Sequence, residues 1–456
     1  MQHPRAYELA DRIREFVDQH GDKSLEPLLR EYSPVDIAIA LRELDEEHRN
    51  AVFERLSLEE AAAVLEEADD ETSAEVLDSM DDRAMADIID AMPPDAGADA
   101  IALLDEEDAE RVLELMPDEE SEELEELLKY DPDTAGGIMT PEFVSVPENV
   151  TAADVLTVLR SGVVEPESIS YVYVTDAQDR LAGVLDLREL VTADPSARIP
   201  DFCVKDVISV TPDVDQEEVA RLCNEYDLMA LPVVDEEGHV LGTVTVDDVM
   251  DVVHEEATED IAMLGGTQAQ DLLRKSSLGV ARVRLPWLIP LILGSMGSAT
   301  IIRFFEVTLK EAIALVAFIP VINATAGNSG LQSSTITVRS LALGLAQALG
   351  IRRLLARDLA TGAMMGLACG GVVGGVVSLW LGDPCVGLIV GLSLCCAIVW
   401  STTIGTLIPH IFYWLHLDPA LASGPLVTTL NDIFALLIYF GIATAFLVAG
   451  GNGVGS

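Results

Sequence analysis

An aspartate, Asp432, lies in an apolar segment that is long enough to cross a lipid bilayer, residues 424–450. A charged residue at the centre of a membrane helix costs about 2.5 to 3.5 kcal/mol on insertion scales, so such residues usually face a partner, a cavity or an ion path. Thr428, Thr429 and Asn431 stand within the turn before it. Carboxylate, amide and hydroxyl oxygens are ligands that hard cations prefer. The segment therefore predicts part of a cation pathway. The alternative is an aspartate that sits close to the membrane interface and snorkels, or that pairs with one of the chain's few arginines.

A second apolar segment contains a run of small and amide residues, NATAGNSGLQSST, at positions 323–335. Glycines permit close backbone approach, and opened turns expose carbonyl groups where they line a cavity. We therefore expect a break in this span, with Asn328 and Gln332 near the ion path. Close packing of helices through small residues is an equally good explanation for the glycines.

One carboxylate per chain is too little charge to hold a dehydrated magnesium ion, because magnesium sheds its water reluctantly. Two chains that met along this helix would bring two copies of Asp432 to one axis. Such a site would hold a hydrated ion through hydrogen bonds to its water shell. The membrane half offers no nucleophile paired with a base, so we expect no enzyme.

Five apolar segments are long enough to span a membrane: residues 285–302, 312–338, 359–381, 385–409 and 424–450. Basic residues gather on one side of them, at Arg274, Lys275, Arg282, Arg284, Arg339, Arg352, Arg353 and Arg357. Only Arg303 and Lys310 lie on the other side. The positive-inside rule then places the N-terminal half in the cytoplasm and the C-terminus outside the cell membrane.

The net charge of −51 is confined to the N-terminal half. Residues 285–456 carry six acidic and six basic side chains, which leaves 72 acidic and 21 basic ones before them. A charge of this size and sign disfavours nucleic acid as a partner. With 22 arginines against 5 lysines, the composition indicates adaptation to a salt-rich cytoplasm. The six cysteines show no CxxC spacing and indicate neither a zinc site nor a disulfide framework.

A 12-residue repeat runs through residues 44–117, where acidic, serine or proline residues follow an apolar one at 45, 57, 69, 81, 93, 105 and 117. A second apolar column occupies positions 52, 64, 76, 88, 100, 112 and 124. This pattern predicts short capped helices that stack into a superhelix. Most of its carboxylates are then explained as helix caps.

Two copies of a strand–turn–strand–helix unit follow. VTDAQDRLAGVLDLREL at 174–190 aligns with VVDEEGHVLGTVTVDDV at 233–249 at an offset of 59 residues. We expect strands at FVSV, SYVYVTD, LAGVLDL, VISV, ALPVVDEEG and VLGTVTV. A helix follows the second copy, with Asp248, Asp251, Glu255 and Glu259 on one face. Like charges at this spacing repel, so bound cations would stabilise such a helix, whereas in concentrated salt it could also be a plain solvated face.

The duplicated unit resembles the tandem cystathionine-beta-synthase (CBS) domain. With DPDTAGGIMTPEFVSV, RLPWLIPLIL, TAGNSGLQ and DPALASGPLVTTLNDI in the same order, the chain is similar to the MgtE-type magnesium transporter family over nearly its full length. The resemblance implies an all-α superhelical N domain, an α/β CBS pair and an all-α transmembrane domain of five helices. The expected boundaries are 1–130, 131–200, 201–250, 251–280 for a connecting helix, and 281–456.

The same resemblance implies a homodimeric, channel-like magnesium pore that cytosolic magnesium closes. Its implied pore residues are Asp432, Asn328, Thr428, Thr429 and Gln332. Its implied regulatory magnesium ligands are Asp95, Asp99, Asp215, Glu217, Asp227, Asp248, Asp251, Glu256, Glu259, Asp260 and Asp418. The family's CBS pair also binds ATP, for which Tyr171 and Arg188 lie in matching segments. A broader divalent-cation transporter and a membrane-anchored nucleotide sensor without flux stay as alternatives.

Overall fold

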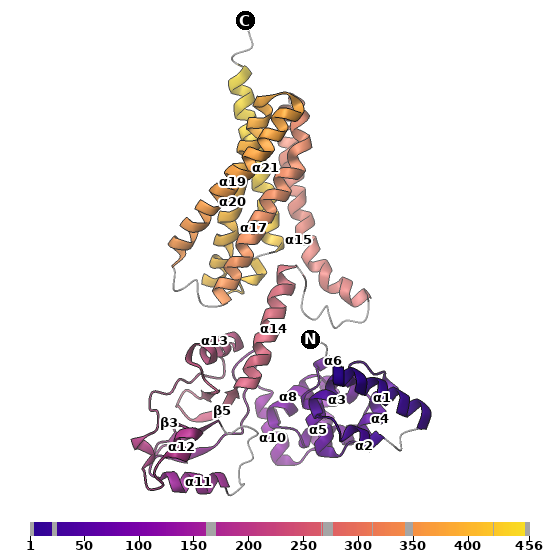
Figure 1. Cartoon of the computed structure of the whole chain (residues 1–456), viewed down its shortest axis with the longest axis vertical. Helices are drawn as coiled ribbons and strands as arrows, with labels where there is room; N and C mark the ends of the chain where they lie inside the picture. Colours follow the sequence, from indigo (N-terminus) through magenta and orange to yellow (C-terminus); the bar gives the residue numbers. More distant parts are fainter. Residues whose placement is uncertain are drawn as a thin grey trace. The chain divides into compact units, whose positions relative to one another are not determined.

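The computed structural model describes residues 4–20, 25–160, 170–265, 267, 277–311, 313–342, 350–422 and 424–451. The chain forms two compact units, Met1–Val253 and His254–Ser456 (Figure 1). The first unit contains the superhelix and the two α/β copies, and the second contains the long apolar helices. Helix α14, Val246–Leu264, runs through the boundary between them.

The superhelix consists of short helices in which each packs mainly against the helix two places away. In chain order they are α1 (Pro4–His20), α2 (Leu25–Leu29), α3 (Pro34–Leu41), α4 (Glu46–Phe53), α5 (Leu58–Glu66), α6 (Asp70–Leu77), α7 (Asp82–Asp90), α8 (Pro94–Ala102), α9 (Glu106–Leu115) and α10 (Asp118–Leu127). Figure 1 shows them wound around one another in the N-terminal part of the chain. Such short helices need neighbours to bury their apolar faces.

The 12-residue repeat sets both the helix starts and the core, as predicted. The side chains of Ser33, Asp45, Ser57, Asp69 and Asp81 each accept a hydrogen bond from a backbone N–H in the first turn of the helix that follows. Pro93 and Pro117 stand at the same place without a side-chain cap. The second apolar column is buried throughout, at Val52, Val64, Val76, Ile88, Ala100, Val112 and Leu124.

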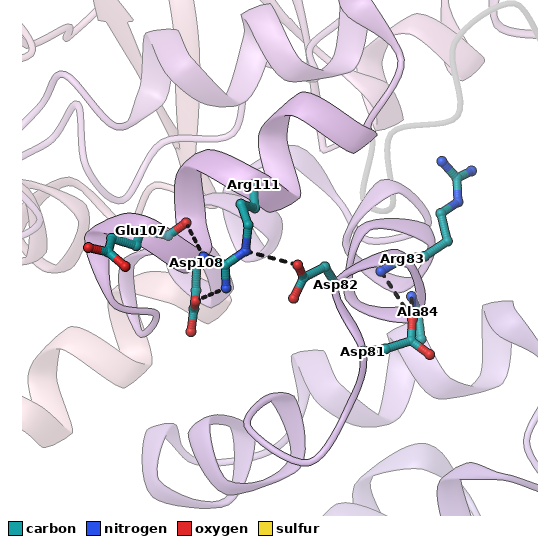
Figure 2. A network of polar contacts seen from close by, with 7 residues as sticks. All are labelled: Asp81, Asp82, Arg83, Ala84, Glu107, Asp108 and Arg111. Atoms are coloured by element: carbon teal, nitrogen blue, oxygen red, sulfur yellow. Dashed lines mark hydrogen bonds and ion pairs between the residues drawn. The ribbon is translucent and has the colours of Figure 1, made fainter.

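Arginine side chains tie alternate helices of the superhelix together. Arg111 on α9 donates through Nε to Asp82 Oδ2 on α7 at 2.9 Å and through Nη1 to the Glu107 carbonyl at 3.0 Å, and it also pairs with Asp108 (Figure 2). Next to Asp82, Asp81 Oδ1 accepts from the backbone N–H groups of Arg83 and Ala84. Of these two neighbouring carboxylates, Asp81 therefore caps a helix and Asp82 pairs with an arginine.

Each α/β copy has a small antiparallel ladder with helices beside it. The first contains β1 (Ser145–Pro147), α11 (Ala152–Arg160), β2 (Tyr171–Thr175), β3 (Leu181–Asp186) and α12 (Leu187–Thr192), and the second contains α13 (Gln216–Tyr226), β4 (Ala230–Val234) and β5 (Val240–Thr245). In the first copy β1 pairs parallel to β2, and β2 pairs antiparallel to β3. In the second, β4 and β5 form an antiparallel pair.

The strand predicted at VISV, residues 207–210, is wrong. Only Val210 pairs there, as an isolated parallel bridge to Val233. Val210 N donates to the Pro232 carbonyl at 3.1 Å, and Val234 N donates back to Val210 at 2.8 Å. The next hydrogen bond of this ladder would have to be donated by the backbone nitrogen of Pro232, which carries no hydrogen. Proline therefore limits the ladder to a single bridge.

The two copies exchange their first extended segments. Thr140, which precedes the first copy's strands, pairs with Thr243 of β5, while Val204, which precedes the second copy's strands, pairs with Val184 of β3. The exchange explains the matched glycines: a Cβ on Gly242 would lie 2.7 Å from the Thr140 carbonyl oxygen, and one on Gly183 would lie 3.1 Å from that of Val204. A buried bond of 2.7 Å between Tyr173 Oη and Thr243 Oγ1 joins the copies as well.

The connecting helix, expected over 251–280, begins earlier as α14 at Val246 and is helical to Leu264. Residues 266 and 268–276, with Arg274 and Lys275, lie outside the described residues.

Among the described residues, five helices are long and apolar enough to cross a membrane, as predicted, and they cluster together (Figure 1). They are α15 (Ser277–Phe304), α17 (Ile319–Ala342), α19 (Ile351–Leu381), α20 (Pro384–Trp414) and α21 (Pro425–Gly451), with α16 (Glu306–Glu311) and the 3₁₀ turn Ile313–Phe318 between the first two. Helix α20 packs against α17, α19 and α21, and α15 packs against α21. Leu394, Tyr439 and Phe440 are fully buried among them.

The break expected in the second span is absent, because α17 is one continuous helix through the small-residue run. Its glycines serve close packing instead: a Cβ on Gly330 would lie 2.4 Å from Ser401 Oγ of α20. Ser329 and Thr337 donate to the carbonyls one turn earlier, at 2.9 and 2.8 Å, which keeps their hydroxyl groups inside the helix. At Gly330 the structure therefore supports the small-residue packing alternative.

Candidate cation-binding sites

Helix α17 presents a polar stripe on its outer surface. Asn328, Gln332 and Thr335 follow one another at spacings of four and three residues, and all three side chains are exposed in the single chain. The opposite side, with Ala326, Ser329 and Gly330, is buried. Amide side chains facing lipid would lack hydrogen-bond partners, which a bilayer interior does not supply. This stripe therefore requires water or another protein surface.

Helix α21 brings Asp432 to a half-buried position. The residues predicted beside it are used differently. Thr428 Oγ1 donates to the Gly424 carbonyl at 2.9 Å, and Thr429 packs on α15, where a Cβ on Gly294 would lie 1.9 Å from its Cγ2 atom. The two threonine side chains therefore serve helix structure and packing in the single chain, and Asp432 supplies the charge of this segment.

A second carboxylate in the long helices, Asp358 of α19, was missed by sequence reasoning. Its Oδ2 atom accepts from Thr406 Oγ1 of α20 at 2.6 Å, and Arg357 Nε lies 3.3 Å from Oδ1. The Thr406 carbonyl is in turn 2.8 Å from His410 Nδ1. The sequence gives no local signal for this contact, because its partners are 48 residues apart.

In the first unit, the structure brings Asp95 of α8 near Asp248 of α14. Burial, followed by the negative charges of Asp95 and Asp247, raises the pKa of Asp248 to about 6, although Thr245 Oγ1 donates to its Oδ2 at 2.6 Å. Asp99 lies one turn after Asp95 and is exposed. Two carboxylates that repel each other across a partly buried gap form half of a divalent-cation site.

Three other predicted ligands have roles in local structure. Asp215 caps α13 and accepts from Glu217 N at 2.8 Å, so these two residues form the first turn of one helix. Asp227 ends the same helix in the left-handed conformation, with φ of 54°. All three side chains are exposed. Asp215 and Glu217 lie at one end of this 11-residue helix and Asp227 lies at the other, so the single chain does not bring the three side chains together.

In the second unit, Asp260 of α14 is a neighbour of Asp418, which follows α20. Burial and then the charge of Asp418 raise the pKa of Asp260 to about 6, and Arg339 partly offsets this. Asp251, Glu255 and Glu259 are exposed along α14, and Glu256 is half-buried. Among the described residues, no three His, Cys, Asp or Glu side chains are arranged to hold a metal ion.

The residues expected to bind ATP lie in the first copy of the α/β unit. Tyr171 begins β2, and its hydroxyl oxygen accepts from Met229 N of the second copy at 3.4 Å. Arg188 is exposed in the first turn of α12, where its N–H donates to Asp186 Oδ1 at 2.6 Å. Tyr171 therefore lies where the two copies meet, and Arg188 lies at the start of a helix.

Three family models match the chain in order. The MgtE intracellular N domain matches residues 32–133, the CBS domain matches residues 135–196 and 199–255, and MgtE, described as a divalent cation transporter, matches residues 319–442. The cytosolic domain of the Mg²⁺ channel MgtE, solved in complex with ATP, superposes with a TM-score of 0.51 at 40% identity. That match covers 53% of this chain and 99% of the solved one.

Two curated relatives extend the likeness through most of the chain. The magnesium transporter MgtE of Thermus thermophilus is 43% identical over 327 residues, which is 71% of this chain and 72% of that protein. The transporter of the same name from Bacillus subtilis is 40% identical over 321 residues, or 70% and 71% of the two chains. With its five apolar helices, this chain is a multi-pass membrane protein and belongs to the MgtE family of magnesium transporters.

Proposed function

We propose that the protein conducts magnesium through a pore that two copies of the chain form along α17 and α21. The observation that carries this proposal is the exposed polar stripe of Asn328, Gln332 and Thr335 on a helix long enough to span the membrane. A second copy, placed on a two-fold axis, would cover the stripe and face it with an identical one. Water and ions could then occupy the space between them.

The charge at the axis would come from two copies of Asp432. Magnesium gives up its water reluctantly, so it would pass as a hydrated ion. Amide and hydroxyl groups can form hydrogen bonds to the water molecules around it. Softer divalent metals prefer nitrogen and sulfur ligands, which this oxygen-lined path would not offer. A broader divalent-cation transporter is the alternative within this class.

Cytosolic magnesium would close the pore through the acidic pairs Asp95–Asp248 and Asp260–Asp418. In each pair, burial and then repulsion from the second carboxylate raise the pKa of one carboxyl, so a bound divalent ion would stabilise the arrangement that holds the two together. The ion that permeates would then also close the gate, which gives negative feedback. ATP bound near Tyr171 and Arg188 would be a second regulator, in line with the ATP complex of the related cytosolic domain.

The orientation follows from the arginines that flank the spans. Arg339, Arg352, Arg353 and Arg357 are exposed at the ends of α17 and α19 that we assign to the cytoplasmic side. The acidic unit would then lie in the cytoplasm, where it can sense internal magnesium.

Magnesium influx into proteoliposomes with a trapped fluorescent indicator, in concentrated potassium chloride and low internal magnesium, tests the pore. We expect Asp432→Asn to lower influx sharply. Asp383→Asn is the matched control, because Asp383 caps α20 and asparagine is an equally good cap. Equal influx in the wild type and both variants would remove Asp432 from the ion path. No influx in any of them would favour a nucleotide sensor.

A further inference from the structure

Three amide or indole side chains of the membrane unit have buried polar atoms without hydrogen-bond partners among the described residues. They are Asn431 at both Oδ1 and Nδ2, Asn323 at Oδ1 and Trp400 at Nε1. The Asn431 side chain is 1% exposed. Several serine and threonine hydroxyls in these helices, such as that of Ser329, donate to the carbonyl one turn earlier. The larger amide and indole groups do not make that bond here, and lipid offers them no replacement.

These groups share one layer of the helix bundle. A Cβ on Gly327 of α17 would lie 3.6 Å from Asn431 Nδ2 of α21, and Asn323 stands one turn before Gly327 on the same side of α17. Ser401 Oγ of α20 donates to the Ala326 carbonyl at 2.5 Å, which fixes the neighbouring Trp400 at the same level. The Trp400 ring lies 4.7 Å from that of Phe434, three residues after Asn431.

The donors and acceptors of these side chains indicate which species could bind between them. The indole N–H and the amide NH₂ group are donors, whereas the two amide oxygens are acceptors. A dehydrated cation would be repelled by the donors, and an anion would meet no positive charge. Water both donates and accepts, and buried water in proteins commonly makes two to four such bonds.

We propose that α17, α20 and α21 enclose a site for ordered water inside each protomer, held by Asn431, Asn323 and Trp400. Asn431 directly precedes Asp432, so its hydrogen bonds to this water fix the rotation of the turn that carries the carboxylate. Asn431 is then a positioning residue for the ion path. This second step rests on the proposed function, whereas the water site itself does not.

Trp400 provides a direct probe of the site. The other three tryptophans, Trp287, Trp380 and Trp414, are replaced by phenylalanine in the full chain, which leaves one indole in the membrane unit. A water-bonded indole emits at longer wavelength than a dry one, and its fluorescence rises when the protein is prepared in D₂O. We expect both properties in this protein. Emission that does not respond to D₂O would overturn the water site without any change at Asn431.

Asn431→Leu replaces the amide with an apolar side chain of similar size and should remove the bound water. Trp400 emission should then shift to shorter wavelength and no longer respond to D₂O. Ser393→Ala is the matched control, because Ser393 is also fully buried with an unpartnered hydroxyl among the described residues but lies two turns from Trp400. A blue shift in the control as large as in Asn431→Leu would contradict the proposal.

The positioning role is tested by influx in the same background. Asn431→Leu should lower magnesium influx and change the ratio of magnesium to nickel influx, and Asn431→Ser, which keeps a hydroxyl and leaves room for another water, should restore both. A dry layer with unchanged influx and ratio would overturn the positioning role. If no variant carries magnesium, the proposed function fails, but the fluorescence result stands.

Discussion

At the scale of single residues, position separates carboxylates that look alike in the sequence. Asp81 and Asp215 cap helices and accept hydrogen bonds from backbone N–H groups of the first turn. Asp176 pairs with Arg180, which lowers the pKa of the aspartate to about 2. Asp248 and Asp260 have the opposite surroundings, because burial and a second carboxylate disfavour their charge. These two are therefore the acids that gain most from a bound cation.

Asp248→Asn should stabilise the protein at neutral pH in the presence of a chelator. The folded pKa of about 6 lies above the ordinary 3.8, so the folded state holds the proton more tightly and wild-type stability falls as pH rises between these values. Above that range the ionised form costs up to about 3 kcal/mol. Thermal unfolding of the detergent-solubilised chain should show the variant's advantage near about pH 7.5 and lose it below about pH 4.

Asp251, which is exposed on the same helix and is not among the charges that shift Asp248, provides the control as Asp251→Asn. An advantage that does not vary with pH, or that the control shares, would show that burial of Asp248 is not its source. Added magnesium should stabilise the wild type more than Asp248→Asn.

Sequence reasoning located the residues that are conspicuous along the chain itself. Asp432 is a charge in an apolar run, and the acids of α14 share one helix face. It did not find the bond from Thr406 to Asp358 or the layer around Trp400, because their partners come together only when α19, α20 and α21 pack. Nor could it tell that Thr428 and Thr429 would be occupied by backbone bonding and packing.

At the scale of helices, glycine decides how closely α19 and α20 approach. Gly366, Gly370 and Gly374 recur every four residues on α19, and a Cβ on any of them would lie 2.4 to 2.8 Å from a backbone oxygen of α20. Gly371 and Gly375 lie on the same helix with no atom within 4 Å. Close backbone contact of this kind is how helices associate in membranes, where water does not drive them together.

Gly370→Ala should therefore destabilise the membrane unit, whereas Gly371→Ala should not. Overpacking of this size typically costs about 1 to 3 kcal/mol, and alanine at the open position gains up to about 1 kcal/mol of helix propensity. The midpoint of thermal unfolding, followed by tryptophan fluorescence, measures both. Equal midpoints for the two variants would mean that α19 and α20 do not meet through this face.

Elements with a regular period were predictable, and elements set by tertiary contacts were not. The 12-residue repeat gave every helix start from Asp45 to Pro117 because caps and core residues are local signals. The VISV segment has a strand-like composition, yet Pro232, in another strand, limits its pairing. The small-residue run in α17 has the composition of a break, yet packing against Ser401 and its neighbours keeps it helical.

At the scale of the whole molecule, charge and hydropathy divide the chain into a strongly acidic part and an apolar part without net charge. The whole net charge of −51 lies before residue 285, where acidic side chains outnumber basic ones by 72 to 21. The ion pairs described in the superhelix, such as Arg111–Asp82, are partly exposed and contribute little individually. Self-repulsion in the acidic unit is therefore opposed mainly by burial and by dissolved ions.

Salt should accordingly stabilise one unit and leave the other unchanged. Raising potassium chloride from about 0.1 M to about 1 M shortens the Debye length from about 10 Å to about 3 Å. All four tryptophans lie after residue 254, so their fluorescence reports the membrane unit, while far-ultraviolet circular dichroism includes the acidic one. We expect salt to raise the circular dichroism midpoint by at least about 5 °C, given 2 to 4 °C per kcal/mol.

A fluorescence midpoint that moves as far as the circular dichroism midpoint would show that salt acts on the whole protein or that the units unfold together. No movement of either would mean that the acidic surface carries no unfavourable self-repulsion.

The exchanged segments of the two α/β copies affect the order in which the newly made chain can fold on the ribosome. Thr140 is synthesised on the order of 100 residues before its partner Thr243, which is roughly 5 to 20 s at ordinary rates of translation. Throughout that interval Thr140 has no edge to join, whereas the segment around Val204 emerges partway through it and can then pair with β3. The first copy can therefore form before the second, but the exchange between the copies is complete only when β5 has emerged, shortly before synthesis turns to the membrane helices.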